Sequence, residues 1–264
     1  MLPVQSHHPD SREGPYLSIN GMKVHSRIQE RINDEINGTK LVEYWRHKQR
    51  FTGDPDNVDW SALAMATKSI KVSEQTILTK LLTNRAPTAY ILHRKNLHDD
   101  SLCPICRAQE EREDHIYKCG DQEVERNFES QLKIAKMKLR KGNLIEESTI
   151  AKIIQRLKAY RRAPGQEVNE ELYIQELQEE QRMLGSMAFF NGIFHINWRN
   201  KLSGVMGTRL VIRTILEFRI QIWKHRCNLV HNRDQNQKRK ENLIGEYKRI
   251  QNQRPRSLSM IDRQ

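Results

Sequence analysis

Three of the four cysteines of the chain lie in one short stretch, SLCPICRAQEEREDHIYKC, together with one histidine. The spacing is C-x2-C-x8-H-x3-C, and the four residues are Cys103, Cys106, His115 and Cys119. Two cysteines separated by Pro-Ile suit a tight turn that directs both sulfur atoms at one point. If DHIYKC is helical, His115 and Cys119 lie about one turn apart on the same face. Three thiolates and one imidazole at these distances are typical ligands of tetrahedral zinc.

Four protein ligands would fill the coordination shell of such an ion. A filled shell leaves no position for water or substrate, so the spacing indicates a structural zinc ion and not a catalytic one. The ion would stabilise a segment with few apolar side chains of its own, chiefly Leu102, Ile105 and Ile116. The alternative is that the cysteines are reduced and unlinked and that the histidine is incidental.

The chain is strongly basic, because 45 Lys and Arg residues stand against 33 Asp and Glu residues, a formal net charge of +12. Such an excess favours a polyanion, first nucleic acid and then an anionic membrane surface. The cysteine stretch is an exception, since segment 109–126 holds seven acidic and three basic residues. We expect that surface to repel phosphates. Segment 132–162 holds ten basic and two acidic residues, and segment 232–264 holds nine and four.

The predicted nucleic-acid contacts lie in the first of these basic segments. They are Lys133, Lys136, Lys138, Arg140, Lys141, Arg156, Lys158, Arg161 and Arg162. Tyr160 is a candidate for stacking on a base. The alternative for each basic segment is a solvated helix face without a ligand. Segment 167–180, which holds six Glu and no basic residue, could lie near the basic segment and mask it until nucleic acid competes.

The elements that must position these residues are mainly helices. Asn20-Gly21 between two short apolar runs predicts a β-hairpin over 16–24. Elsewhere apolar residues recur at helical spacing, and Asp59 is a suitable N-cap for a helix that starts at Trp60. Other helices are predicted over 26–49, 124–141, 149–160, 171–183 and 208–232. The predicted fold is mostly α: a helical bundle with a short N-terminal β-hairpin and one structural zinc knuckle.

The domain organisation follows from breaks in these patterns. We predict a disordered tail (1–15), a helical domain (16–162) with the zinc knuckle (101–120), a linker (163–170), a C-terminal helical region (171–232) and a basic polar tail (233–264). The first residues lack the apolar core of a signal peptide, and no run approaches the roughly 18 apolar residues of a membrane span. We therefore expect an intracellular protein, in the cytoplasm or nucleus, with reduced thiols and no membrane partner.

A second Cys/His group lies near the C-terminus. His225, Cys227 and His231 could be interpreted as a cysteine nucleophile with histidine bases. On one helix, however, positions two and four residues from Cys227 do not both face it. We therefore expect these side chains to have a packing role.

Ordered landmarks along the chain resemble a known family. They are Ile19-Asn20-Gly21 with Val24, Leu41 with Tyr44-Trp45, Val58-Asp59-Trp60, the four metal ligands, the glycine-aromatic stretch 185–198, and Trp223, His225, Arg226, Asn228 and His231. In this order they are similar to the C-terminal region of non-LTR-type retroelement reverse transcriptase open reading frames, closest to those frequent in algae such as diatoms. There a CPxC…HxxxC segment follows the polymerase. The resemblance covers about residues 14–232 and departs at Cys227, where asparagine is expected.

This resemblance implies an accessory module that lies downstream of polymerase and ribonuclease H domains and has them as possible partners. The chain shows no YxDD-type polymerase carboxylates, no ribonuclease H acidic set and no clean PD…(D/E)xK nuclease pattern. We therefore expect a module that binds RNA or DNA, carries a structural Zn²⁺ and is not an enzyme. One alternative is a structural or protein-interaction module without direct nucleic-acid contact. Another is a nuclease, which would need a carboxylate cluster.

Overall fold

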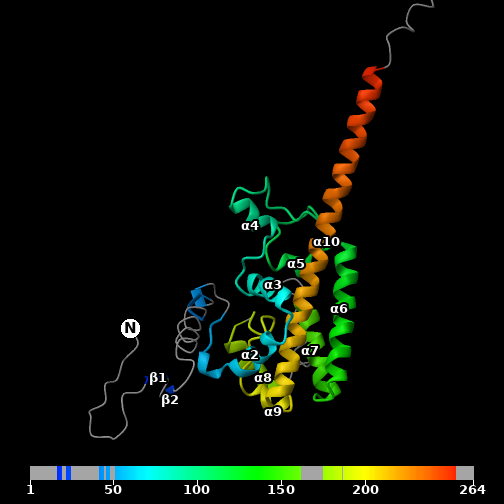
Figure 1. The fold of residues 1–264 in the computed structure, drawn as a ribbon. Helices are drawn as coiled ribbons and strands as arrows, with labels where there is room; N and C mark the ends of the chain where they lie inside the picture. Colours follow the sequence, from blue (N-terminus) through cyan, green and yellow to red (C-terminus); the bar gives the residue numbers. More distant parts are fainter. Residues whose placement is uncertain are drawn as a thin grey trace, which may run out of the picture.

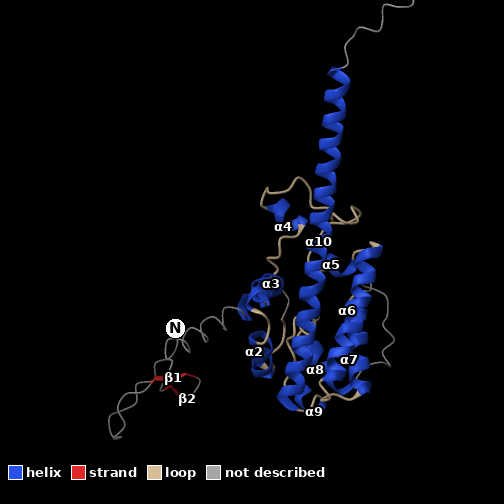
Figure 2. Ribbon diagram, turned by 45° about the vertical axis from the view of Figure 1, so that its right-hand side comes forward, coloured by secondary structure: helices blue, strands red, loops and turns tan. Residues whose placement is uncertain are grey.

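The computed structural model describes residues 17–19, 22–24, 42–44, 46–47, 51–161, 175–185 and 187–253. Within these ranges the chain is mostly helical, which confirms the predicted helical class (Figures 1 and 2). Residues 42–44 and 46–47 are helical. The other helices are η1 (Pro55–Asn57), α2 (Trp60–Lys68), α3 (Val72–Leu82), α4 (Ala89–Arg94), α5 (His115–Lys118), α6 (Gln122–Lys141), α7 (Glu147–Ala159), α8 (Gln175–Met183), α9 (Trp198–Lys201) and α10 (Gly204–Gln253).

Two short strands, β1 (Leu17–Ile19) and β2 (Met22–Val24), pair antiparallel with Leu17 opposite Val24. The predicted turn at Asn20-Gly21 and the strand side chains lie outside the described residues, so the hairpin as a whole stays a prediction. The predicted tail 1–15 and linker 163–170 also lie outside them.

The longest helix, α10, is the axis around which the body packs. Helices α2 and α6 lie along its first half, and α3, α5 and α9 also contact it (Figures 1 and 2). One hydrophobic cluster takes in side chains from both sides of the predicted linker, among them Leu132, Leu157 and Ile215. Past about residue 233, α10 extends away from the body (Figure 1), and Leu243 and Ile244 are exposed there. No helix among the described residues combines the length and apolarity needed to cross a membrane.

The predicted start of α2 is confirmed, and it ties α2 to α9. The Asp59 carboxylate accepts hydrogen bonds from the backbone N–H of Ala62 and the hydroxyl of Ser61, both at 2.9 Å. Arg199 donates two further bonds to the same carboxylate, each at 2.6 Å. Because Asp59 is buried, this bidentate pair fixes the position of α9 on α2.

Candidate metal centre

The first two cysteines lie in a compact loop that folds back on itself. The backbone N–H of Cys103 donates to the carbonyl of Gln109, and the N–H of Arg107 donates to the carbonyl of Cys103, both at 2.8 Å. Arg107 has φ of 56°, the left-handed conformation that reverses the chain after Cys106. This turn directs the sulfur atoms of Cys103 and Cys106 towards the same side of the loop, as the spacing predicts.

The other two ligands come from the short helix α5. His115 is its first residue and Cys119 is its C-cap. The ligand atoms of Cys103, Cys106, His115 and Cys119 all lie within 4.8 Å of one another. None of the four cysteines of the chain is in a disulfide, and only Cys106 among the ligands is partly exposed. The structure therefore brings together the whole predicted ligand set in a geometry that could hold a metal ion.

Hydrogen bonds around the ligands favour the metal-binding forms of His115 and Cys103 but not that of Cys119. The Nε2 atom of His115 lies 3.3 Å from the sulfur of Cys106, and its Nδ1 lies 3.2 Å from Oε1 of Gln109. An N–H on Nδ1 would donate to this amide oxygen, which leaves the Nε2 lone pair directed at the sulfur atoms. A hydrogen bond between Cys103 and Cys119, 4.0 Å apart, lowers the pKa of Cys103 to about 3 and raises that of Cys119. Cys103 is then a thiolate at neutral pH, the form that binds a cation.

Two of the seven acidic residues of this stretch are buried, which the prediction of a phosphate-repelling surface does not take into account. Glu111 is fully buried and accepts two hydrogen bonds from Arg226 of α10. Glu113 is also buried and pairs with Arg219 at 3.0 Å. Four of the remaining five pair with a cation: Glu110 with Arg112, Asp114 with Lys118, Asp121 with Arg233, and Glu125 with Arg161. The buried pairs of Glu111 and Glu113 dock the knuckle (residues 101–120) on α10.

Two arginines also bind the backbone of the knuckle. Nη2 of Arg161, at the end of α7, donates to the carbonyl of Cys119 at 3.0 Å. Nη1 of Arg233, on α10, donates to the carbonyl of Ile105 and lies 3.4 Å from that of Pro104. The ligand cysteines also pack against Val124 and Leu229. Sequence reasoning missed this support, although three arginines at seven-residue spacing on one helix (219, 226 and 233) were a visible signal.

The predicted phosphate contacts on α6 and α7 differ in their surroundings. Lys133 and Lys141 are exposed and have no ion-pair partner among the described residues. Arg156 lies over the ring of Phe189, and Arg162 lies outside the described residues. The other surface cations have carboxylate partners: Lys136 and Arg140 pair with Glu147, Lys138 with Glu217, and Lys158 with Glu129. The linear charge count of segment 132–162 therefore overstates its surface charge, because Glu217 and Glu129 come from outside it.

Arg161 and Tyr160 occupy interior positions that the prediction of nucleic-acid contacts did not foresee. The Arg161 side chain is only 15% exposed and lies over the ring of Phe128, in addition to its bond to Cys119. The Tyr160 ring stacks on Phe190, with centroids 4.0 Å apart. Tyr160 is thus already stacked within the core, and a substitution of Arg161 would disturb the metal centre together with any phosphate contact.

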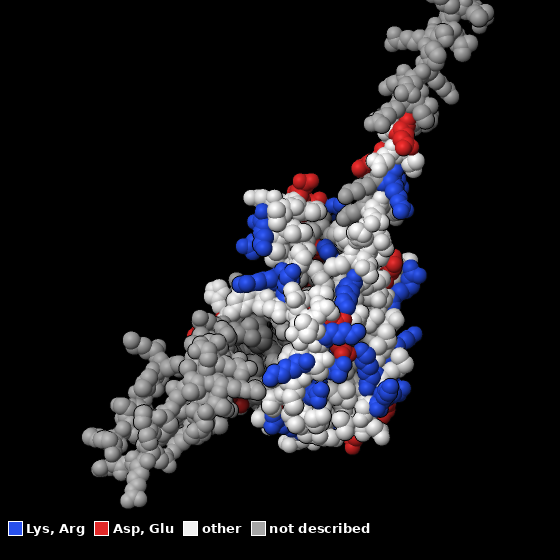
Figure 3. All heavy atoms as spheres, viewed as in Figure 1, with Lys and Arg blue, Asp and Glu red and all other residues white. Residues whose placement is uncertain are grey.

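Basic side chains are spread over one face of the body. Figure 3 shows Lys and Arg along the side formed by α6 and the first half of α10, with fewer acidic side chains among them. Some of these cations belong to the ion pairs above, such as Lys138 with Glu217 at 2.6 Å. Exposed pairs, such as that of Arg140 with Glu147, contribute only about 0–1 kcal/mol, so a phosphate can compete with the carboxylate.

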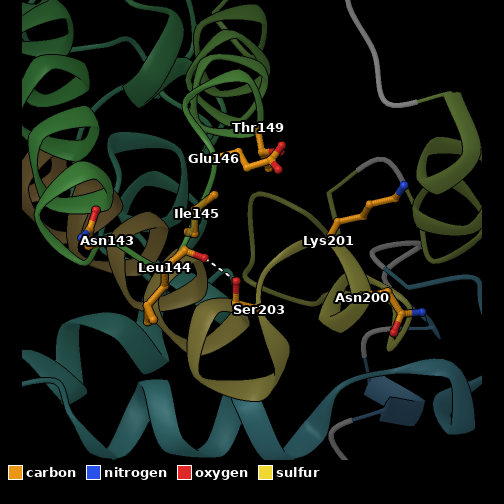
Figure 4. A pocket seen from close by; sticks show the side chains of 8 residues that line it. All are labelled: Asn143, Leu144, Ile145, Glu146, Thr149, Asn200, Lys201 and Ser203. Carbon is orange, nitrogen blue, oxygen red and sulfur yellow. Dashed lines mark hydrogen bonds between the residues drawn. The ribbon is translucent and has the colours of Figure 1, made fainter.

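A separate hollow of about 570 Å³ lies between the start of α7 and α9 (Figure 4). Its lining is Asn143, Leu144, Ile145, Glu146, Thr149, Asn200, Lys201 and Ser203. The Ser203 hydroxyl donates to the carbonyl of Leu144 at 2.6 Å and has no histidine beside it. Among these eight side chains there is no nucleophile with an adjacent base, so the hollow has no catalytic arrangement.

The second Cys/His group does not form a nucleophilic site. Burial raises the pKa of the Cys227 thiol, which keeps it protonated at neutral pH. His231 lies 2.8 Å from the side chain of Gln235. A cysteine nucleophile needs a lowered pKa. Cys227 packs against the main hydrophobic cluster, as predicted, whereas His231 is exposed and does not have the predicted packing role.

Comparisons with known proteins do not assign the chain to a family. No family model matches the chain, and no curated protein and no solved structure matches it either.

Proposed function

We propose that the chain is a nucleic-acid-binding accessory module of a retroelement-derived protein, with one structural zinc ion and no catalysis of its own. The observation that carries the proposal is the convergence of Cys103, Cys106, His115 and Cys119 in a basic helical protein. The retroelement origin rests on the resemblance of the ordered sequence landmarks. It implies that polymerase and ribonuclease H domains of the same element are partners.

Zinc is the metal that the donor set favours. Three thiolates and an imidazole are borderline-soft ligands, and their number matches the four positions of tetrahedral zinc. Four protein ligands leave the ion no position for water or substrate, so its contribution is to fold stability. Cys103 and Cys119 are buried, which also suits a structural site.

Phosphate binding is supported by the net charge of +12 and by the exposed cations of α6 and α7. Lys133 and Lys141 are the best candidates, since neither has a carboxylate partner among the described residues. Lys136, Lys138, Arg140 and Lys158 can join them if phosphates replace their carboxylate partners. Such contacts are independent of base sequence, so the proposal covers both RNA and DNA.

The test is a salt titration of binding to labelled RNA and DNA duplexes and single strands. The variant is Lys133→Glu/Lys141→Glu, and the control is Lys80→Glu/Lys95→Glu, an equal charge change at exposed lysines outside α6 and α7. Each lost phosphate contact makes the slope of log K against log salt shallower by about 0.9 on duplex DNA. We therefore expect a loss of about 2 in slope for the variant only. Equal binding by variant and control would exclude this surface.

A second candidate is a structural or protein-interaction module without direct nucleic-acid contact. The many ion pairs on α6 and α7 favour it, because they already neutralise most of the predicted contacts. Binding that does not respond to a several-fold change in salt would support this alternative. A nuclease has less support, since the Cys/His set is the only candidate metal cluster within the described part of the chain.

A further inference from the structure

Three arginines of α10 follow one another at seven-residue spacing, which places them two turns apart along one face. Each one reaches the cysteine-rich stretch. Arg219 binds Glu113, Arg226 binds Glu111, and Arg233 binds Asp121 together with carbonyls of the knuckle. The middle part of α10 (residues 219–233) is therefore in contact with the segment that carries the ligands.

Arg233 and a fourth arginine, Arg161, bind backbone carbonyls beside the ligands. Arg233 binds the carbonyl of Ile105, which lies between the first two cysteines, and Arg161 binds the carbonyl of Cys119 itself. The two guanidinium groups come from different helices, α10 and α7. Arg233 holds the turn that carries Cys103 and Cys106, and Arg161 holds Cys119 at the C-cap of α5.

The charge of the centre gives Arg161 a further role. A zinc ion with three thiolates and a neutral imidazole carries one net negative charge. A buried negative charge is costly unless cations or hydrogen-bond donors lie close to it. Arg161 is 15% exposed, so its positive charge acts in a poorly solvated environment beside Cys119.

We propose that Arg161 and Arg233 are positioning residues of the metal centre, and that metal binding is linked to the docking of the end of α7 and of residues 226–233 of α10 on the knuckle. This inference rests on the proposed metal site. By linkage, contacts that favour the bound centre must in turn be favoured by the metal. Groups of this kind that hold metal ligands in place typically change metal affinity by about 10–100-fold when they are replaced.

The experiment measures metal affinity by competition with a chromophoric chelator, using Zn²⁺, and by the visible absorption of the Co²⁺-loaded protein. The variants are Arg161→Gln and Arg233→Gln. Lys158→Gln and Arg239→Gln are the controls, because they remove an exposed cation from the same two helices. We expect each variant to bind Zn²⁺ at least about 10-fold more weakly than its control. Arg233→Lys should recover part of the affinity, since an ammonium still donates to one carbonyl.

Hydrogen exchange of the unmodified protein tests the reciprocal effect and does not depend on whether a variant folds. Removal of the metal should increase amide exchange in residues 226–233 and 157–161 more than in residues 211–218, which pack against the core. Wild-type affinity in both variants, or exchange that does not change in these segments, would overturn the inference. A wild-type chain that binds no metal would instead contradict the proposed metal site, so the two failures are distinguishable.

Discussion

Arg219 carries a charge that is completely buried, and such a charge is costly unless it is paired. Its guanidinium donates to Asn191 at 2.6 Å and to Glu113 at 3.0 Å, and it lies over the ring of Phe190. Burial alone would lower the pKa of Arg219, but Tyr117 and Glu113 outweigh that effect and raise it. The side chain is therefore charged, and one guanidinium connects α10 with α5 and the glycine-aromatic stretch.

Replacing this residue should be severely destabilising. Arg219→Met leaves Glu113 buried without its cation, and breaking a buried ion pair in this way costs about 3–5 kcal/mol. Arg213→Met on the same helix removes a partly exposed pair with Glu217, which keeps its pair with Lys138, and should cost less than about 1 kcal/mol. Urea denaturation of the metal-loaded proteins gives both values. Similar losses for the two variants would show that Arg219 contributes no more than a surface cation.

The sequence predicts a contact when the two residues that make it are close together in the chain, and it does not predict the contact when they are far apart. The ligand turn at Cys103 and the N-cap at Asp59 are local patterns, and both were predicted. The bond from Arg161 to Cys119 and the pair of Arg226 with Glu111 join residues 42 and 115 positions apart. Such partners are set by helix packing, which residue spacing does not reveal. For this reason Arg161 was predicted to contact phosphate, and Glu111 and Glu113 were predicted to lie on a surface that repels phosphates.

At the scale of elements, the junction between α9 and α10 depends on a glycine. A Cβ at Gly207 would lie 1.4 Å from the carbonyl oxygen of Leu202, which no side-chain movement can relieve. Gly245, in the outer part of the same helix, has nothing within 4 Å of such a Cβ. The close approach of α9 to the first turn of α10 is thus possible only without a side chain at position 207.

The same substitution should therefore have opposite effects at the two glycines. Gly207→Ala forces the backbone of Leu202 away and should cost at least about 1–3 kcal/mol. Gly245→Ala should stabilise the helix by up to about 1 kcal/mol, because alanine is the better helix former. Thermal unfolding of the two variants is a matched comparison. A Gly207→Ala protein as stable as the wild type would mean that α9 does not approach α10 this closely.

The contact between α2 and α9 makes a pH-dependent contribution to stability. Burial would raise the pKa of Asp59, but hydrogen bonds from Arg199, Ala62 and Ser61 outweigh it and hold the pKa below the ordinary value of 3.8. A lowered pKa in the folded state means that the contribution is present above pH of about 4 and is lost as the pH falls through the folded-state pKa.

We therefore expect wild type and Asp59→Asn to differ most in unfolding free energy near neutral pH and to converge as the pH falls through the lowered pKa of Asp59. Denaturant titrations at several pH values measure the difference. Asp56→Asn, at a nearby residue without an ion-pair partner among the described residues, is the control and should follow the wild type. A difference between wild type and Asp59→Asn that does not change with pH would show that the Arg199 bond does not depend on the charge.

At the scale of the molecule, the knuckle connects parts of the chain that are far apart in sequence. It contacts α6 through Val124, the end of α7 through Arg161, and α10 through Leu229 and Arg233. A metal ion that orders the knuckle would thus stabilise helices that carry no ligand themselves. At a free zinc concentration 1,000 times the dissociation constant, the unfolding free energy should be higher by about 4 kcal/mol. An unchanged unfolding midpoint after zinc titration would argue against this role.

The metal content of the purified protein tests the central claim most directly. Elemental analysis should find one zinc ion per chain in the wild type and in Cys227→Ser, whose cysteine lies outside the ligand set. Cys119→Ser removes one ligand and should lose the ion. A wild-type chain without zinc, or a Cys119→Ser chain that retains it at full occupancy, would contradict the account.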